Sequence, residues 1–157
     1  MNTNPPPDHP NVIGFPPLLT LSSAVASSAF AYFIPLPIAE NMGARLVSGA
    51  LALAAGALAT WAARTMRSAG TNIDPSEPAL TIVRGGPFRF TRNPMYLALC
   101  LLHAAQGFLL NNWLPVAATA VLWAVLHFGV VLREERYLEA KFGETYLTLR
   151  RSVRRWI

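Results

Sequence analysis

The chain has 157 residues, of which 53% are hydrophobic and 13% charged, whereas a soluble domain carries ~25% charged residues. This composition excludes an ordinary soluble domain and indicates one membrane-embedded domain. The formal net charge of +5 does not favour nucleic-acid binding, because the basic residues gather in two blocks beside apolar segments, which suits anionic lipid headgroups.

The first 14 residues, MNTNPPPDHPNVIG, contain neither Lys nor Arg and so lack the charged start of a secretory signal. Their prolines predict a disordered lead over 1–14, followed by a single domain over 15–157. The lone cysteine, Cys100, has no metal-ligand spacing around it, so no metal site is expected.

Four apolar segments have the length that a helix needs to cross a bilayer, about 20 residues at 1.5 Å each. They lie at about 18–38, 44–63, 95–110 and 113–132. In the second segment Gly49 and Gly56 stand on one face, where small residues let neighbouring helices approach closely. We therefore expect an all-α fold, an integral membrane four-helix bundle.

The positions of Lys and Arg predict the orientation of these spans. Five basic residues lie between the second and third segments, seven follow the fourth, and one, Arg45, lies on the other side. With four crossings, one side carries 12 of the 13 basic residues, and the positive-inside rule makes it the cytoplasm. We expect a bacterial inner-membrane protein with both termini and the active site in the cytoplasm.

The third and fourth segments are joined by Asn111-Asn112, and such a tight turn forces an antiparallel hairpin. A chain that leaves the cytoplasmic surface at Met95 and returns after Leu132 brings two polar clusters together. They are Arg92-Asn93-Pro94-Tyr96 and Arg133-Glu134-Glu135-Tyr137.

The tail, 133–157, has apolar residues at three- and four-residue steps, which predicts an amphipathic cytoplasmic helix that Gly143 divides in two. Its last basic residues are expected to contact lipid phosphates: Arg150, Arg151, Arg154 and Arg155. Glu134 and Glu135 need a different explanation, since adjacent carboxylates repel each other and anionic lipid. They require either a structural ion pair with a nearby Arg, or a cationic or hydroxyl-rich ligand.

The segment GGPFRFTRNPMYLA, followed after the hairpin by REERYLEAKFGETYLTLRRSVRRWI, resembles the isoprenylcysteine carboxyl methyltransferase and phospholipid methyltransferase superfamily over about residues 80–155. The resemblance implies a membrane enzyme that uses cytoplasmic S-adenosylmethionine to methylate a lipid-borne or hydrophobic acceptor. It assigns Arg92, Asn93, Pro94 and Tyr96 to a first cofactor-binding motif and Glu134 and Glu135 to a second, with Phe142, Gly143 and Tyr146 closing over it.

Two departures from the superfamily pattern bear on the mechanism, Asn93 in place of His and Phe88 in place of Tyr. Because Asn cannot titrate near neutrality, we expect Asn93 to position rather than to transfer a proton. A sulfonium methyl is already electrophilic, so alignment in a dry cavity is the main task. Arg92 and Arg133 are candidates to hold a carboxylate of the cofactor or of an acidic acceptor.

Four further polar residues are candidates for contact with the acceptor. Thr71 and Asn72 either form a turn or line the acceptor's path. His103 and Gln106 share a face of the third segment, where they either bond to another helix or mark the lipid-side end of a substrate cavity. His127 in the fourth segment has the same two interpretations.

Two other functions compete with the methyltransferase. An NADPH-dependent membrane sterol or enone reductase resembles the same superfamily but requires a longer chain with more spans. A small four-helix transporter requires an ionisable group near the midplane, whereas all eight acidic residues here lie at or outside the span ends. The acceptor itself, a carboxylate, a phospholipid amine or a thiol, stays open.

Overall fold

The computed structural model describes residues 8–39 and 42–157, and these form helices and no strand. In chain order the helices are α1 (Pro16–Phe33), α2 (Met42–Ser68), η1 (Gly86–Arg89), α3 (Pro94–Leu109), α4 (Trp113–Leu126), η2 (His127–Val131), α5 (Leu132–Phe142) and α6 (Glu144–Ser152). η1 is one 3-10 turn, and η2 is a π-helical stretch that joins α4 to α5. The expected all-α class is confirmed.

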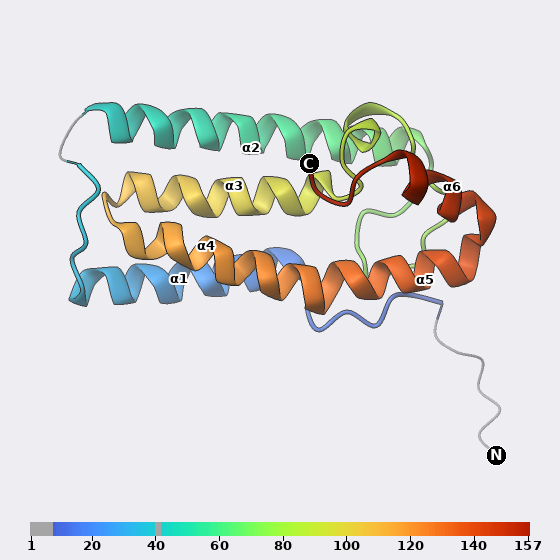
Figure 1. Ribbon diagram of the computed structural model, residues 1–157, viewed down its shortest axis with the longest axis horizontal. Helices are drawn as coiled ribbons and strands as arrows, with labels where there is room; N and C mark the ends of the chain where they lie inside the picture. Colours follow the sequence, from blue (N-terminus) through green and yellow to red (C-terminus); the bar gives the residue numbers. More distant parts are fainter. Residues whose placement is uncertain (1–7, 40–41) are drawn as a thin grey trace, which may run out of the picture.

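The four helices α1 to α4 run alongside one another, and α3 contacts each of the other three (Figure 1). Within the described residues, two helices are long and apolar enough to cross a membrane, α2 and the continuous helix Trp113–Phe142. α3 is apolar but has 16 residues, and α1 has 18 with two prolines at its start. The four-span arrangement therefore stays a prediction.

Helix boundaries differ from those expected at three places. α1 ends at Phe33 rather than near residue 38, because Pro35 and Pro37 follow and the residue before a proline is pushed out of the helical region. α2 continues past residue 63 to Ser68. The helix of the fourth segment does not stop at 132 but continues as α5. Glu134 and Glu135 therefore lie on this continuing helix.

The predicted hairpin between α3 and α4 is confirmed. Asn111 adopts a positive φ of 49°, and the Asn112 side chain caps α4 by accepting a hydrogen bond from the Leu114 N–H at 2.8 Å. A Cβ at Gly107 would lie 2.8 Å from the Val116 backbone nitrogen, so only glycine allows this close approach. The start of α3 and the start of α5 consequently lie at the same end of the bundle (Figure 1).

Small residues do pack α2 against α3, but not the predicted pair. Around Gly49 and Gly56 a Cβ would meet nothing within 4 Å among the described residues. The buried residues on α2 are instead Ala44, Ser48, Ala55 and Ala62. Ser48 also donates a hydrogen bond across the interface to the Ala105 carbonyl at 2.8 Å. The small residues of α2 correctly predicted close packing against a neighbouring helix, but the predicted contact was placed on the wrong face of α2.

His103 and Gln106 join helices in the middle of the bundle. The two His103 ring nitrogens lie 3.0 Å from the hydroxyls of Ser23 on α1 and Thr119 on α4. The Gln106 amide donates to the Ala24 carbonyl at 2.9 Å and to the Ser28 hydroxyl. These contacts are the helix-to-helix bonds that the sequence offered as one of two interpretations.

The expected disordered lead covers 1–14, of which residues 1–7 lie outside the described residues. Residues 8–14 are not a free lead, because they lie along η2 and α5. The Ile13 N–H donates to the Gly129 carbonyl at 3.2 Å, and Ile13 occupies the space that a Cβ at Gly129 would need. Farther along, Asp8 forms an ion pair with Lys141 at 2.6 Å. The π-helical stretch η2 thus provides the backbone carbonyl to which the N-terminal segment is hydrogen-bonded.

Candidate active site

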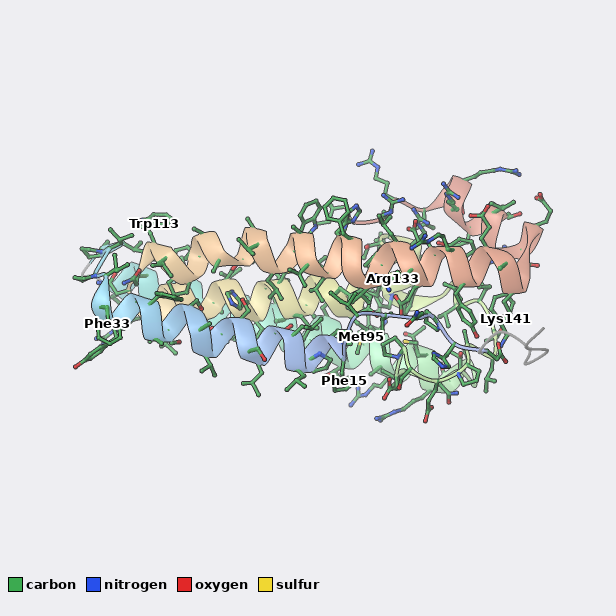
Figure 2. The ribbon with its side chains drawn as sticks, turned by 90° about the horizontal axis from the view of Figure 1, so that it is seen from below. Phe15, Phe33, Met95, Trp113, Arg133 and Lys141 are labelled. Carbon is green, nitrogen blue, oxygen red and sulfur yellow. The ribbon has the colours of Figure 1, made fainter. Side chains whose placement is uncertain are left out.

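A cavity of about 460 Å³ lies at the end of the bundle where α3 and α5 begin. Figure 2 shows Met95 and Arg133 toward this end of the bundle, and Phe33 and Trp113 at the opposite end. The lining includes nine residues that the sequence singled out: Thr71, Asn72, Arg92, Asn93, Pro94, Tyr96, Glu134, Glu135 and Tyr146. The hairpin has brought both motifs to one cavity.

Arg92 and Glu135 connect the two motifs directly. Arg92 Nη1 lies 2.9 Å from Glu135 Oε1, and each side chain is 9% exposed. The same nitrogen donates to the Tyr146 hydroxyl at 2.9 Å. Burial raises the pKa of Tyr146, and the charge of Glu135 adds to this while Arg92 opposes it. The ion pair joins the segment before α3 to α5, and Tyr146 adds α6.

Arg155 completes this cluster and was not foreseen. Its Nε and Nη2 donate to the two oxygens of Glu135, each at 2.8 Å, in a bidentate pair. The expectation that Arg155 contacts lipid phosphates was therefore wrong. After α6 ends at Ser152, the extended Val153 turns the chain back toward the start of α3. The one hint in the sequence was that adjacent carboxylates need several cations.

Asn93 is held by the same returning segment. It is buried, its side-chain amide donates to the Arg155 carbonyl at 2.9 Å, and its backbone N–H donates to the Thr91 hydroxyl at 3.2 Å. Pro94 occupies the first turn of α3, where its missing N–H costs nothing. Asn93 therefore has positioning contacts at the wall of the cavity.

Glu134 has surroundings unlike those of Glu135. The Tyr96 hydroxyl donates to Glu134 Oε1 at 2.8 Å. No Lys or Arg in the described ranges, 8–39 and 42–157, lies within ion-pair distance of Glu134. Both residues line the cavity. The site consequently presents one neutralised carboxylate and one carboxyl group without a cation.

The loop between α2 and α3 forms another wall of the cavity. Thr71 Oγ1 accepts from the Leu80 N–H, and the Asn72 amide donates to the Pro78 carbonyl, each at 3.0 Å. These turn contacts leave both residues in the lining. Asp74, also in the lining, accepts hydrogen bonds from Ser76 that lower its pKa. Tyr137, which the sequence placed in the second polar cluster without a role, supports this loop by accepting from the Ala79 N–H at 3.1 Å.

Several predicted site residues lie outside the cavity lining. Arg133 donates to the Asn11 carbonyl at 2.7 Å, and Phe142 lies beside Lys141. His103 and Gln106 are committed to the helix contacts described above. His127 stacks on Trp123 with ring centres 5.1 Å apart and accepts from Trp156 Nε1 at 3.2 Å. The cavity gives no support to a substrate or cofactor contact for these residues.

The phospholipid methyltransferase family model matches residues 44–145, which is well over half of the chain. The chain belongs to the phospholipid methyltransferase family. The match includes most of α2, the first motif and the Glu134-Glu135 pair, so the resemblance noted from the sequence is confirmed. Family membership indicates a methyltransferase and, together with the two long apolar helices, an integral membrane protein.

The chain is also similar to an uncharacterized protein of Haemophilus influenzae (strain ATCC 51907 / DSM 11121 / KW20 / Rd). The two are 38% identical over 63 residues, which are 40% of this chain and 100% of that protein. No solved structure matches this phospholipid methyltransferase family member.

Proposed function

We propose that this protein is an integral membrane methyltransferase that binds S-adenosylmethionine in the cavity beside Arg92 and Glu135 and methylates a lipid-borne or hydrophobic acceptor. The observation that carries the proposal is the meeting of the two motifs across the buried Arg92–Glu135 pair, at the wall of one cavity. A family match to a methyltransferase agrees with this chemistry.

The polar residues of the cavity fit the proposed cofactor. Among the described residues, Arg92 Nε is a buried donor without a hydrogen-bond partner, which calls for an explanation. A carboxylate such as that of the cofactor's methionine moiety would satisfy it, because guanidinium groups bind carboxylates well. Glu134, which has no cation, can accept hydrogen bonds from an amino group or ribose hydroxyls. Tyr146 offers an aromatic face in the same lining.

The apolar residues of the cavity suit alignment in the absence of water. Phe15 before α1, Met66 on α2 and Leu99 on α3 all belong to the lining. When bound, S-adenosylmethionine supplies an electrophilic methyl group, so the protein's main task is to hold the acceptor in line and exclude competing water. Asn93 cannot act as a base near neutral pH and contributes by position. A carboxylate, an amine or a thiol can serve as the nucleophile in such a cavity.

We place the cavity at the cytoplasmic surface, with α1 to α4 as four spans of a bacterial inner membrane. This placement is supported by the basic residues, 12 of which fall on the side of the two motifs. It would also allow a hydrophobic acceptor to enter from the bilayer while the cofactor arrives from the cytosol.

Titration of the purified full-length protein in detergent tests the proposed function. We expect saturable binding of S-adenosylhomocysteine in a calorimeter and no comparable binding of NADPH. Tight NADPH binding without S-adenosylhomocysteine binding would favour the reductase instead, which the family match does not support. Incubation with deuterated-methyl cofactor and bacterial lipid extract, followed by mass spectrometry, would then identify the acceptor.

A further inference from the structure

The chain after α6 forms a strap, residues 153–156, that closes on the first motif. The Arg154 carbonyl accepts from the Arg92 N–H at 3.0 Å. The Arg155 carbonyl accepts from the Asn93 amide at 2.9 Å and from the Thr91 hydroxyl at 3.2 Å. Figure 1 shows the C-terminus returning to the start of α3. The strap therefore holds the backbone of Arg92 and the side chain of Asn93, which are the first two residues of the first motif.

The side chain of Arg155 fixes the second motif at the same time. Its guanidinium binds both oxygens of Glu135, while Arg92 binds one of them. Glu135 and Arg92 line the cavity, whereas Arg155 approaches Glu135 from outside that lining. A single residue thus holds Asn93 through its carbonyl and Glu135 through its side chain.

The charges explain why this contact matters for binding. Glu135 is buried beside Glu134, so an ionised carboxylate there requires compensation. Without Arg155, Arg92 would be the one arginine of the described residues left in an ion pair with Glu135. With Arg155 in place, two arginines share Glu135, and Arg92 Nε is left without a partner among the described residues. Binding groups need a supporting layer of this kind to stay in a productive geometry.

We propose that Arg155 is a positioning residue of the cofactor site, which acts through Glu135 and Asn93 to hold the two motifs in their binding arrangement. The proposal rests on the proposed function. Arg155 lies beyond residues 44–145, which the family model matches, and so is not assigned by that match.

The test compares three full-length variants in detergent by calorimetric titration with S-adenosylhomocysteine. Arg155→Ala should weaken binding about tenfold or more, the scale on which loss of a supporting partner acts. Arg155→Lys should recover part of that loss, because it keeps the charge but not the bidentate geometry. Arg154→Ala is the matched control, since its side chain is exposed, and should stay within about twofold of wild type.

Thermal melting without ligand shows whether each variant is folded at the titration temperature. If Arg155→Ala is not, Arg155→Lys decides, and wild-type affinity in that variant would overturn the proposal. Equal affinities in wild type and Arg155→Ala, or an equal loss in Arg154→Ala, would overturn it as well. Failure of the wild-type protein to bind would overturn the proposed function and this inference together.

Discussion

Glu134 and Glu135 are neighbours in sequence, yet the structure gives them opposite environments. Glu135 is shared by two arginines, while Glu134 receives a hydroxyl hydrogen bond from Tyr96 and no cation from the described residues. The difference arises because successive helical residues point in directions about 100° apart. Glu135 joins the two motifs, whereas Glu134 lines the cavity with a hydroxyl partner and no cation from the described residues.

Replacement of Glu135 by Gln should cost both stability and binding. The change leaves Arg92 as a buried, uncompensated cation, whereas Arg155, whose side chain is 32% exposed, regains water. We expect a loss of roughly 3 kcal/mol of unfolding free energy, the lower end for a broken buried pair, and no measurable S-adenosylhomocysteine binding. Arg92→Ala should also abolish binding.

The control for this change is Glu139→Gln on the same helix. Glu139 pairs with Arg150 at the surface, where such pairs contribute little, so its loss should cost within about 0.5 kcal/mol. Thermal melting in detergent and calorimetry measure both variants. Wild-type affinity in Glu135→Gln would contradict the placement of the cofactor.

Replacement of Tyr96 by Phe tests how much the hydrogen bond to Glu134 contributes to stability. The hydroxyl donates to Glu134 at 2.8 Å, and its removal leaves a carboxyl group, whose pKa burial raises to about 7, without that bond. We expect a loss of about 2 kcal/mol in thermal or chemical unfolding, the cost of leaving a buried acceptor without its partner. Tyr32→Phe serves as the control, because Tyr32 is 84% exposed, and should leave stability unchanged. Equal stability of the two variants would show that the Tyr96 bond contributes nothing.

At the scale of the elements, the loop from α2 to α3 depends on a glycine. Gly86 combines a φ of +55° with a position where a Cβ would collide with Thr65 and approach Trp61 Nε1 to 3.0 Å. The glycine lets η1 lie against α2, and this contact sets the course of the loop toward the cavity. A pair of glycines before a proline carried little meaning in the sequence, because their contacts come from a distant helix.

Gly86→Ala should therefore destabilise the protein by at least about 2 kcal/mol, from left-handed backbone strain together with overpacking. S-adenosylhomocysteine binding should weaken as well, because the displaced loop supplies Phe88 and Asn72 to the cavity lining. Gly49→Ala is the contrasting change, since its Cβ would meet nothing within 4 Å and a helix interior prefers alanine. It should be neutral or slightly stabilising, and a similar loss in both variants would refute the explanation.

At the scale of the whole molecule, the sequence predicted those features that depend on residues close together in the chain. Apolar length gave the helices, and Asn111-Asn112 gave the hairpin that joins the motifs. The strap could not be predicted, because an arginine-rich amphipathic pattern fits a lipid surface as well as a return onto Glu135. The role of His103 could not be predicted either, because its hydrogen-bond partners Ser23 and Thr119 come from two other helices. In both cases the choice between two interpretations depends on contacts between residues far apart in the sequence.

Orientation in the membrane is the remaining property of the whole molecule, and cysteine labelling tests it. Cys100 is buried and can be replaced by Ala, after which single cysteines are placed at Ser76 in the α2–α3 loop or at Leu36 after α1, both exposed. The distribution of basic residues predicts that Ser76 lies on the cytoplasmic side with the cavity and Leu36 on the opposite side. A membrane-impermeant maleimide should label Leu36→Cys in intact cells and Ser76→Cys after the membrane is opened. Labelling of both in intact cells would contradict a cytoplasmic cavity, because the cofactor would then face the wrong compartment.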